Sequence, residues 1–231
     1  MKRNEKTFTR YYLPFLSSAM SLSLIRFSWL SAILSLFHYA ITCFNDQSGY
    51  YKAIFQLFII VNACSIVLSF IKRIYYKFQV ATFILIGINF LIILLDLDFL
   101  GLLMFTNANV NYNNVYSWYA LLYIIVMLVT IIVSSVYYGY CYKIKKERVL
   151  GCGVEAKKKE NSHLLSYGII FGLVLLAPSL LTGHIQNLFG VLLGLLFSVV
   201  SPGLIVDSFY AAYLIHKDPE YKETRETMKS K

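Results

Sequence analysis

The sequence predicts an all-α, polytopic membrane protein: a bundle of six transmembrane helices with its N- and C-termini in the cytoplasm. Of the 231 residues, 58% are hydrophobic and only 14% are charged, and the mean hydropathy is +0.62. Soluble domains carry about 25% charged residues, so this chain has too few to cover a globular surface. The apolar runs are long and lack period-two alternation, which excludes a transmembrane β-barrel.

Each membrane-crossing helix needs about 20 mostly apolar residues. Six stretches meet this requirement, at 24–44, 53–71, 78–105, 118–142, 164–182 and 187–215. The chain therefore divides into a basic cytoplasmic tail (1–23), a transmembrane domain (24–215) and a charged cytoplasmic C-terminal tail (216–231). Within the first tail, residues 8–23 form either a short interfacial helix or an early, tilted start of the first span.

The orientation follows from the distribution of the 21 Lys and Arg residues. They gather in the N-terminal tail, at 72–77, at 143–159 and in the C-terminal tail, all on one side of the predicted bundle. Lys52 is the one exception. Because cations are retained on the cytoplasmic side, both termini are predicted to be cytoplasmic, which requires an even number of spans.

Charge and cysteine content limit the classes of partner. The net charge of +9 predicts contact with anionic headgroups on the cytoplasmic side of the lipid bilayer, and no nucleic acid partner. The four cysteines have no CxxC spacing, so we expect free thiols with no metal site. We also expect no cofactor. The predicted location is a plasma membrane of bacterial type, crossed several times.

Four ionisable side chains lie near the outer ends of the predicted spans: His38, Asp96, Asp98 and His184. Carboxylates and imidazoles at one level can bind a divalent cation or relay protons. However, Asp96 and Asp98 are two residues apart and point about 200° from each other on a helix. The favoured interpretation is that the third span ends near Leu95 and leaves both aspartates in headgroup water.

Arg26 and Asp207 form the predicted buried ion pair on the inner side. If the sixth span runs to residue 215, Asp207 lies about 12 Å from the boundary, and Arg26 is the cation at comparable depth. Alternatively, Pro202 and Gly203 end the span and leave Asp207 in an interfacial helix. Both interpretations stay open at this point.

Small residues in the last two predicted spans indicate close helix packing. Each span has a GxxxG pair followed by a proline: Gly168, Gly172 and Pro178 in one, Gly190, Gly194 and Pro202 in the other. Such pairs let helices approach closely, and paired Gly/Pro interruptions also occur at transport sites. Because the two spans are antiparallel, the pairs lie in opposite leaflets, and each must pack on a different neighbour.

Function is less constrained than architecture. No catalytic motif of the common hydrolase, metalloprotease or nucleotide-binding types is present, so we do not expect an enzyme. The leading hypothesis is a permease-like membrane subunit for a small or amphipathic solute, acting with a partner membrane protein or a cytoplasmic ATPase. Its six spans resemble, in topology alone, the permease subunits of ABC-2-type exporters. The alternative is a membrane interaction protein, such as a toxin or bacteriocin immunity or accessory factor. An intramembrane enzyme is the third hypothesis, and it depends on the outer His and Asp residues.

Overall fold

The structure is a computed structural model that describes residues 22–46, 48–108, 110–151 and 185–217. Within these ranges the chain is helical and has no strand. In chain order the elements are η1 (Leu22–Phe27), α2 (Ser28–Asn45), α3 (Tyr50–Phe70), α4 (Lys72–Lys77), α5 (Gln79–Phe105), η2 (Tyr112–Tyr116), α6 (Trp118–Gly151) and α8 (Ile185–Lys217).

Five of these helical segments are long and apolar enough to cross a membrane: η1 with α2, α3, α5, α6 and α8. They match the predicted spans 24–44, 53–71, 78–105, 118–142 and 187–215 to within a few residues at most ends. The all-helical membrane class is therefore confirmed. The predicted span 164–182, with Gly168, Gly172 and Pro178, lies outside the described residues, and so does His184. Six spans and the orientation of the termini stay predictions.

The structure decides one helix boundary that the sequence left open and differs from expectation at another. Pro202 lies inside α8, which continues to Lys217, so Pro202 and Gly203 do not end this span. The packing of α8 along α5 and α6 holds it continuous through the proline. By contrast, α6 extends to Gly151, nine residues into the hydrophilic segment predicted to begin at 143, because that segment continues the run of good helix formers.

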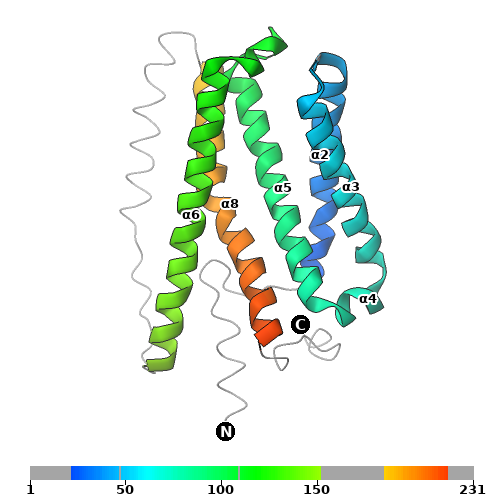
Figure 1. The fold of residues 1–231 in the computed structure, drawn as a ribbon, viewed down its shortest axis with the longest axis vertical. Helices are drawn as coiled ribbons and strands as arrows, with labels where there is room; N and C mark the ends of the chain where they lie inside the picture. The colour runs from blue at the N-terminus through cyan, green and yellow to red at the C-terminus, as the bar shows by residue number, and fades with distance from the viewer. Residues whose placement is uncertain (1–21, 47, 109, 152–184, 218–231) are drawn as a thin grey trace.

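Figure 1 shows α5 in the middle of the bundle, with α2 and α3 on one side of it and α6 and α8 on the other. The α2–α3 turn, η2 and the start of α8 lie together at one end, which we call the loop end. The short helix α4 and the end of α8 lie at the opposite end, which we call the α4 end.

Helices α6 and α8 run in the same direction, both starting at the loop end (Figure 1). The Tyr123 hydroxyl near the start of α6 lies 3.4 Å from the carbonyl oxygen of Gly190 in α8. Further along both helices, the Tyr138 hydroxyl donates a 2.9 Å hydrogen bond to the carbonyl oxygen of Val199. The two contacts progress together along the chain, which is the mark of a parallel pair.

The closest helix approach is between α5 and α8, and glycine makes it feasible. A Cβ atom at Gly101 would lie 2.8 Å from the carbonyl oxygen of Gly190 and would also collide with the Tyr123 hydroxyl. A Cβ atom at Gly190 would lie 2.6 Å from the backbone nitrogen of Phe105. The GxxxG pair Gly190 and Gly194 thus lies against α5 and α6.

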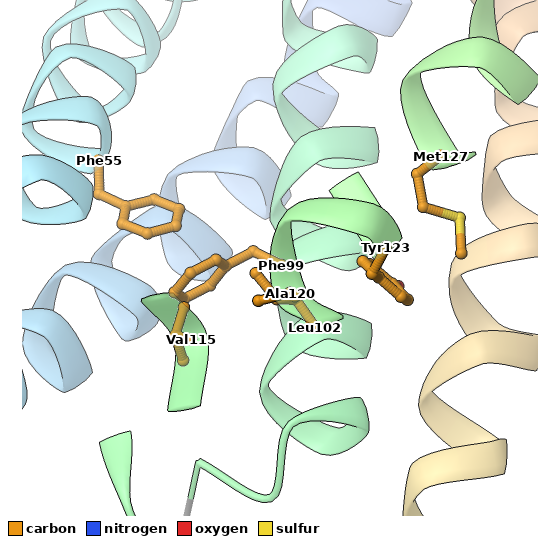
Figure 2. Close-up of a cluster of buried hydrophobic side chains, with 7 residues drawn as sticks. All are labelled: Phe55, Phe99, Leu102, Val115, Ala120, Tyr123 and Met127. Carbon is orange, nitrogen blue, oxygen red and sulfur yellow. The ribbon is translucent and has the colours of Figure 1, made fainter. Parts of the chain in front are cut away.

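Apolar packing is concentrated near the two ends of the bundle. The cluster near the loop end joins α3, α5, η2 and α6 and is shown in Figure 2: Phe55, Phe99, Leu102, Val115, Ala120, Tyr123 and Met127. The cluster near the α4 end joins η1, α5 and α8: Leu22, Ile25, Phe83, Ile86, Ala212 and Ile215. On α5, the buried polar residues Asn89, Asp96 and Asp98 lie between the two clusters.

Asp46 organises the turn between α2 and α3. Its carboxylate accepts hydrogen bonds from the backbone N–H groups of Ser48 (3.1 Å), Gly49 (3.1 Å) and Lys52 (3.2 Å), and the Tyr116 hydroxyl of η2 donates to it. Partial burial acts in the opposite direction, but these hydrogen bonds together lower the pKa of Asp46 below its ordinary value. Burial, followed by the hydrogen bond to Asp46, raises the pKa of Tyr116 to about 12. The turn therefore holds an ionised carboxylate at the start of α3.

Candidate functional site

The polarity of α2 is inverted relative to a helix on a soluble protein. Every buried residue of this helix is polar: Ser28, Ser31, Ser35, His38 and Thr42, each 0–1% exposed. Its exposed face is apolar and includes Trp29, Ile33, Leu36 and Phe37. Because hydrocarbon solvates apolar side chains, a membrane helix has no need to bury them, and its inward face is free to carry polar groups.

The five polar residues of α2 are spaced three and four positions apart in alternation, so they form one straight row. From Ser28 to Thr42 this row is about 21 Å long, at 1.5 Å per residue. Neighbouring helices add four more buried polar residues on the facing side: Asn62 and Ser65 from α3, and Asn89 and Asp96 from α5. We call these nine residues the polar seam.

Hydrogen bonds join the three helices within the polar seam. The Ser35 hydroxyl donates to Asp96 Oδ2 at 2.7 Å, and the Asn62 amide donates to the Ser35 hydroxyl at 3.1 Å. Closer to the α4 end, the hydroxyl of Ser65 lies 3.2 Å from Asn89 Oδ1. Each of these contacts crosses from one helix to another, so the seam helps to hold α2, α3 and α5 together.

Much of the hydrogen-bonding capacity of the seam is unused. Seven buried polar atoms of the seam have no hydrogen-bond partner among the described residues: Ser28 Oγ, Ser31 Oγ, both ring nitrogens of His38, Asn62 Oδ1, Asn89 Nδ2 and Asp96 Oδ1. Each unpaired buried polar group costs about 1–3 kcal/mol. Buried polar groups are normally paired, so several unpaired groups in one row call for an explanation.

His38 and Asp96 face each other near the middle of the seam. His38 Nδ1 lies 3.4 Å from Asp96 Oδ1, and the two side chains are 1% and 0% exposed. Asp96 is nine residues before the end of α5, which places it about 14 Å inside the helix. The expectation that the third span ends near Leu95 is therefore wrong: α5 is unbroken to Phe105 and buries Asp96, because serine and histidine from α2 supply the polar contacts that hydrocarbon lacks.

Asp98 lies on the opposite side of α5, as its two-residue separation from Asp96 requires. Its carboxylate oxygens lie 3.2 and 3.1 Å from the hydroxyl of Ser198 in α8. It is 7% exposed, so it too lies in the bundle and not in headgroup water. The four predicted outer residues thus separate: His38 and Asp96 meet, Asp98 joins α8, and His184 lies outside the described residues.

Arg26 and Asp207 are not joined in an ion pair. The Arg26 side chain is exposed, whereas Asp207 is fully buried in α8. Neither carboxylate oxygen of Asp207 has a hydrogen-bond partner among the described residues. Position along the spans predicts a similar depth for the two residues. An ion pair also requires the two side chains to point toward each other, and position along a span does not determine that.

Comparison with protein-family models, with curated proteins and with solved structures finds no match.

The seam contains a serine, a histidine and an aspartate, the residue types of a serine-hydrolase triad, but the contacts among them follow a different order. In a triad, histidine lies between serine and aspartate and removes the serine proton. Here Asp96 lies between Ser35 and His38, and the Ser35 hydroxyl donates to the carboxylate. Ser35 is therefore not prepared as a nucleophile. Among the described residues no group of three or more His, Cys, Asp or Glu side chains is placed to hold a metal ion.

Serine and asparagine are the residues that inspection for ionisable groups missed. Ser28, Ser31 and Ser35 carry no charge, and each is common in membrane helices. The available signal was their alternating three- and four-residue spacing with His38 and Thr42 in a span that is otherwise apolar. That pattern predicts a polar inward face from sequence alone.

Proposed function

We propose that this chain is the membrane-spanning part of a permease-like transporter and that a small polar or amphipathic solute moves along the polar seam. The observation that carries the proposal is the row of buried polar residues on α2, facing Asn62 and Asp96. The row is about 21 Å long, against about 30 Å for the hydrocarbon core of a bilayer. It therefore offers hydrogen bonds over most of the distance that a solute must cross.

Packing alone is a weaker explanation of the seam. Alanine or glycine at positions 28 and 31 would allow the same close approach of helices without leaving hydroxyls unpaired. Interhelical hydrogen bonds average only about 0.6 kcal/mol in a membrane, so they do not by themselves account for a row in which several groups remain unpaired. A path in which these groups form hydrogen bonds with a passing solute accounts both for the polar row and for its unpaired groups.

The parallel course of α6 and α8 supports the six-span topology on which the proposal rests. If both helices cross the bilayer, the chain between Gly151 and Ile185 must return to the loop end, and the predicted span 164–182 provides that crossing. With the positive-inside rule, the loop end then faces outward in a plasma membrane. The basic segment 143–159 faces the cytoplasm, where it is available to anionic headgroups or a cytoplasmic ATPase.

Thiol reactivity in the middle of the bundle tests the proposal. After replacement of the native Cys43, Cys64, Cys141 and Cys152 by alanine, Ser35→Cys is treated in vesicles with a charged, membrane-impermeant methanethiosulfonate reagent. Because thiols react as thiolates, and thiolates form only where water is present, we expect Ser35→Cys to react. The matched control is Leu36→Cys, one residue further along α2 on the exposed apolar face, which contacts lipid and should not react.

A Ser35→Cys thiol that stays as unreactive as Leu36→Cys would overturn the proposal, because the seam would then be dry. In that case the polar row would serve to join helices, and the membrane interaction protein would be the better description. Ser31→Cys and Ile33→Cys provide a second matched pair one turn away, with Ile33 at 61% exposed.

A further inference from the structure

The environment of His38 is unusual for a histidine in a membrane helix. Its ring is enclosed by three aromatic rings: Phe37 at 5.5 Å between centroids, Phe55 at 5.3 Å and Phe99 at 5.4 Å. The Phe55 ring stacks on the imidazole with an interplanar angle of 30°. A cation within about 6 Å of an aromatic face is attracted to it, so this enclosure suits an imidazolium as well as a neutral imidazole.

Asp96 is the charged group that faces His38. On α5, Asp98 points to the other side of the helix, as described above. From α3, Tyr51 packs on Phe99, with 5.0 Å between their ring centroids. On α2 itself, the titratable residue next to His38 is Tyr39, which is half-buried. The net charge of the pair therefore depends on how many protons His38 and Asp96 together hold.

The contact between the two side chains is incomplete. Both nitrogens of His38 and the Oδ1 atom of Asp96 have no hydrogen bond among the described residues, although Nδ1 and Oδ1 are 3.4 Å apart. The other carboxylate oxygen accepts the 2.7 Å hydrogen bond from Ser35, which fixes the carboxylate and leaves Oδ1 directed at the ring. A charge-assisted N–H···O bond is about 2.7–2.9 Å long, so a closure of about half an ångström would complete it.

From this geometry we propose that His38 and Asp96 together form a proton-binding site in the polar seam and that proton binding drives the proposed transport. The inference rests on the proposed function. Without a proton the pair carries one net negative charge inside the bundle, and with one proton it is neutral, either as imidazolium and carboxylate or as imidazole and carboxylic acid. A proton enters from water in the seam and leaves to water in the seam, and no other bond changes.

Charge balance explains why such a site couples to movement. A net charge inside a membrane helix bundle is energetically unfavourable unless water or an opposite charge lies beside it. The proton-free pair therefore needs water or a cationic group beside it, whereas the protonated pair is tolerated in a closed, dry seam. Proton release thus favours an open seam and proton binding favours a closed one, which is the two-state element that a coupled transporter requires.

The titration of His38 tests the proton site directly. The protein contains four histidines, and changing His163, His184 and His216 to glutamine leaves His38 as the reporter. With ¹⁵N-labelled histidine and the protein in lipid nanodiscs, the ring nitrogen shifts are followed from pH 4 to pH 10 by nuclear magnetic resonance. We expect Asp96→Asn to displace the midpoint of this titration by about one pH unit or more, because a charge at this distance has effects of that size.

Asp98→Asn is the matched control, two residues along the same helix and directed at α8. We expect it to leave the midpoint within about 0.3 pH units, since its side chain faces away from the pair. Equal displacement by both variants, or a midpoint that Asp96→Asn does not move, would overturn the proton site. If Asp96→Asn does not fold, Ser35→Ala replaces it: loss of the hydroxyl that holds Asp96 should also move the midpoint, and an unmoved midpoint contradicts the proposal.

The outcomes of the titration and of the thiol test distinguish a failure of the proton site from a failure of the proposed function. A reactive Ser35→Cys with a titration that ignores Asp96 refutes the proton site and leaves the permease. An unreactive Ser35→Cys refutes the permease, and with it the coupling role of the pair, whatever His38 does.

Discussion

The hydroxyl of Ser198 in α8 lies 3.1 and 3.2 Å from the two carboxylate oxygens of Asp98 in α5. Two residues earlier on α5, Asp96 is held in the same way by a serine of α2. The central helix α5 therefore presents one aspartate to each side of the bundle, and each is met by a serine hydroxyl from the helix it faces. Among the described residues neither aspartate is paired with a lysine or arginine, and the one basic side chain beside them is His38, 3.4 Å from Asp96.

Removing the Ser198 hydroxyl should destabilise the bundle. Ser198→Ala leaves the buried Asp98 carboxyl without its hydroxyl donor, at an expected cost of about 1–3 kcal/mol. Ser208→Ala is the control, because Ser208 is equally buried in α8 but bonds only to the Leu204 carbonyl oxygen of its own helix. Thermal unfolding in detergent should show a larger loss for Ser198→Ala, and equal losses would mean that the Asp98 contact contributes little.

The glycine contact between α5 and α8 gives a second prediction. Gly101→Ala should cost about 1–3 kcal/mol, since its Cβ atom meets the Gly190 backbone and the Tyr123 hydroxyl. Gly139→Ala on α6 meets nothing within 4 Å and should be neutral or stabilising by up to about 1 kcal/mol. Thermal stability of the two variants in the same detergent is the measurement. A destabilising Gly139→Ala beside a neutral Gly101→Ala would contradict the packing described here.

Arg26 and Asp207 should behave independently. A buried ion pair broken on one side typically costs about 3–5 kcal/mol, so a pair between these two residues would couple strongly. Because Arg26 is exposed and Asp207 is buried elsewhere, we now expect the interaction energy in a double-mutant cycle to be within about 0.5 kcal/mol of zero. The cycle uses Arg26→Gln, Asp207→Asn and the pair. Strong coupling would show that the two side chains meet after all.

The turn at Asp46 gives a prediction about pH. Because the pKa of Asp46 is lowered in the folded protein, its hydrogen bonds stabilise the fold fully above the unfolded value of about 3.9 and are lost as pH falls through the lower folded value. The stability difference between the wild type and Asp46→Asn should therefore be constant from pH 7 to about pH 5 and shrink below about pH 4. A stability difference between the two proteins that is undiminished at pH 2 would show that ionisation of Asp46 is not its cause.

The spans were predictable because the bilayer imposes a length and a composition on every crossing helix. The limits of α3 and α5 follow directly from their apolar runs. The depth of Asp96 and Asp98 was not predictable in this way, since an aspartate was expected to mark the end of a span. What keeps them inside is a serine on another helix in each case, and a contact between residues 61 or 100 positions apart leaves no mark in a local window.

The direction in which a side chain points around its helix axis was the second feature that the sequence did not predict. Arg26 and Asp207 share a depth but face different surroundings, and only packing decides that. The polar row of α2 is the opposite case: its spacing fixes one face, and the face is recognisable without any partner.

The proposed permease requires a polar seam that connects the two sides of the membrane, and the sidedness of labelling at the ends of the seam tests this directly. In the cysteine-free protein, Thr42→Cys and Ser28→Cys are treated with the impermeant methanethiosulfonate reagent in right-side-out and in inverted vesicles. We predict that Thr42→Cys reacts in right-side-out vesicles and Ser28→Cys in inverted ones, since the two positions lie at the loop end and toward the α4 end of one row. If both cysteines stay unreactive, or react from the same side only, the seam does not cross the membrane and the chain is not a permease.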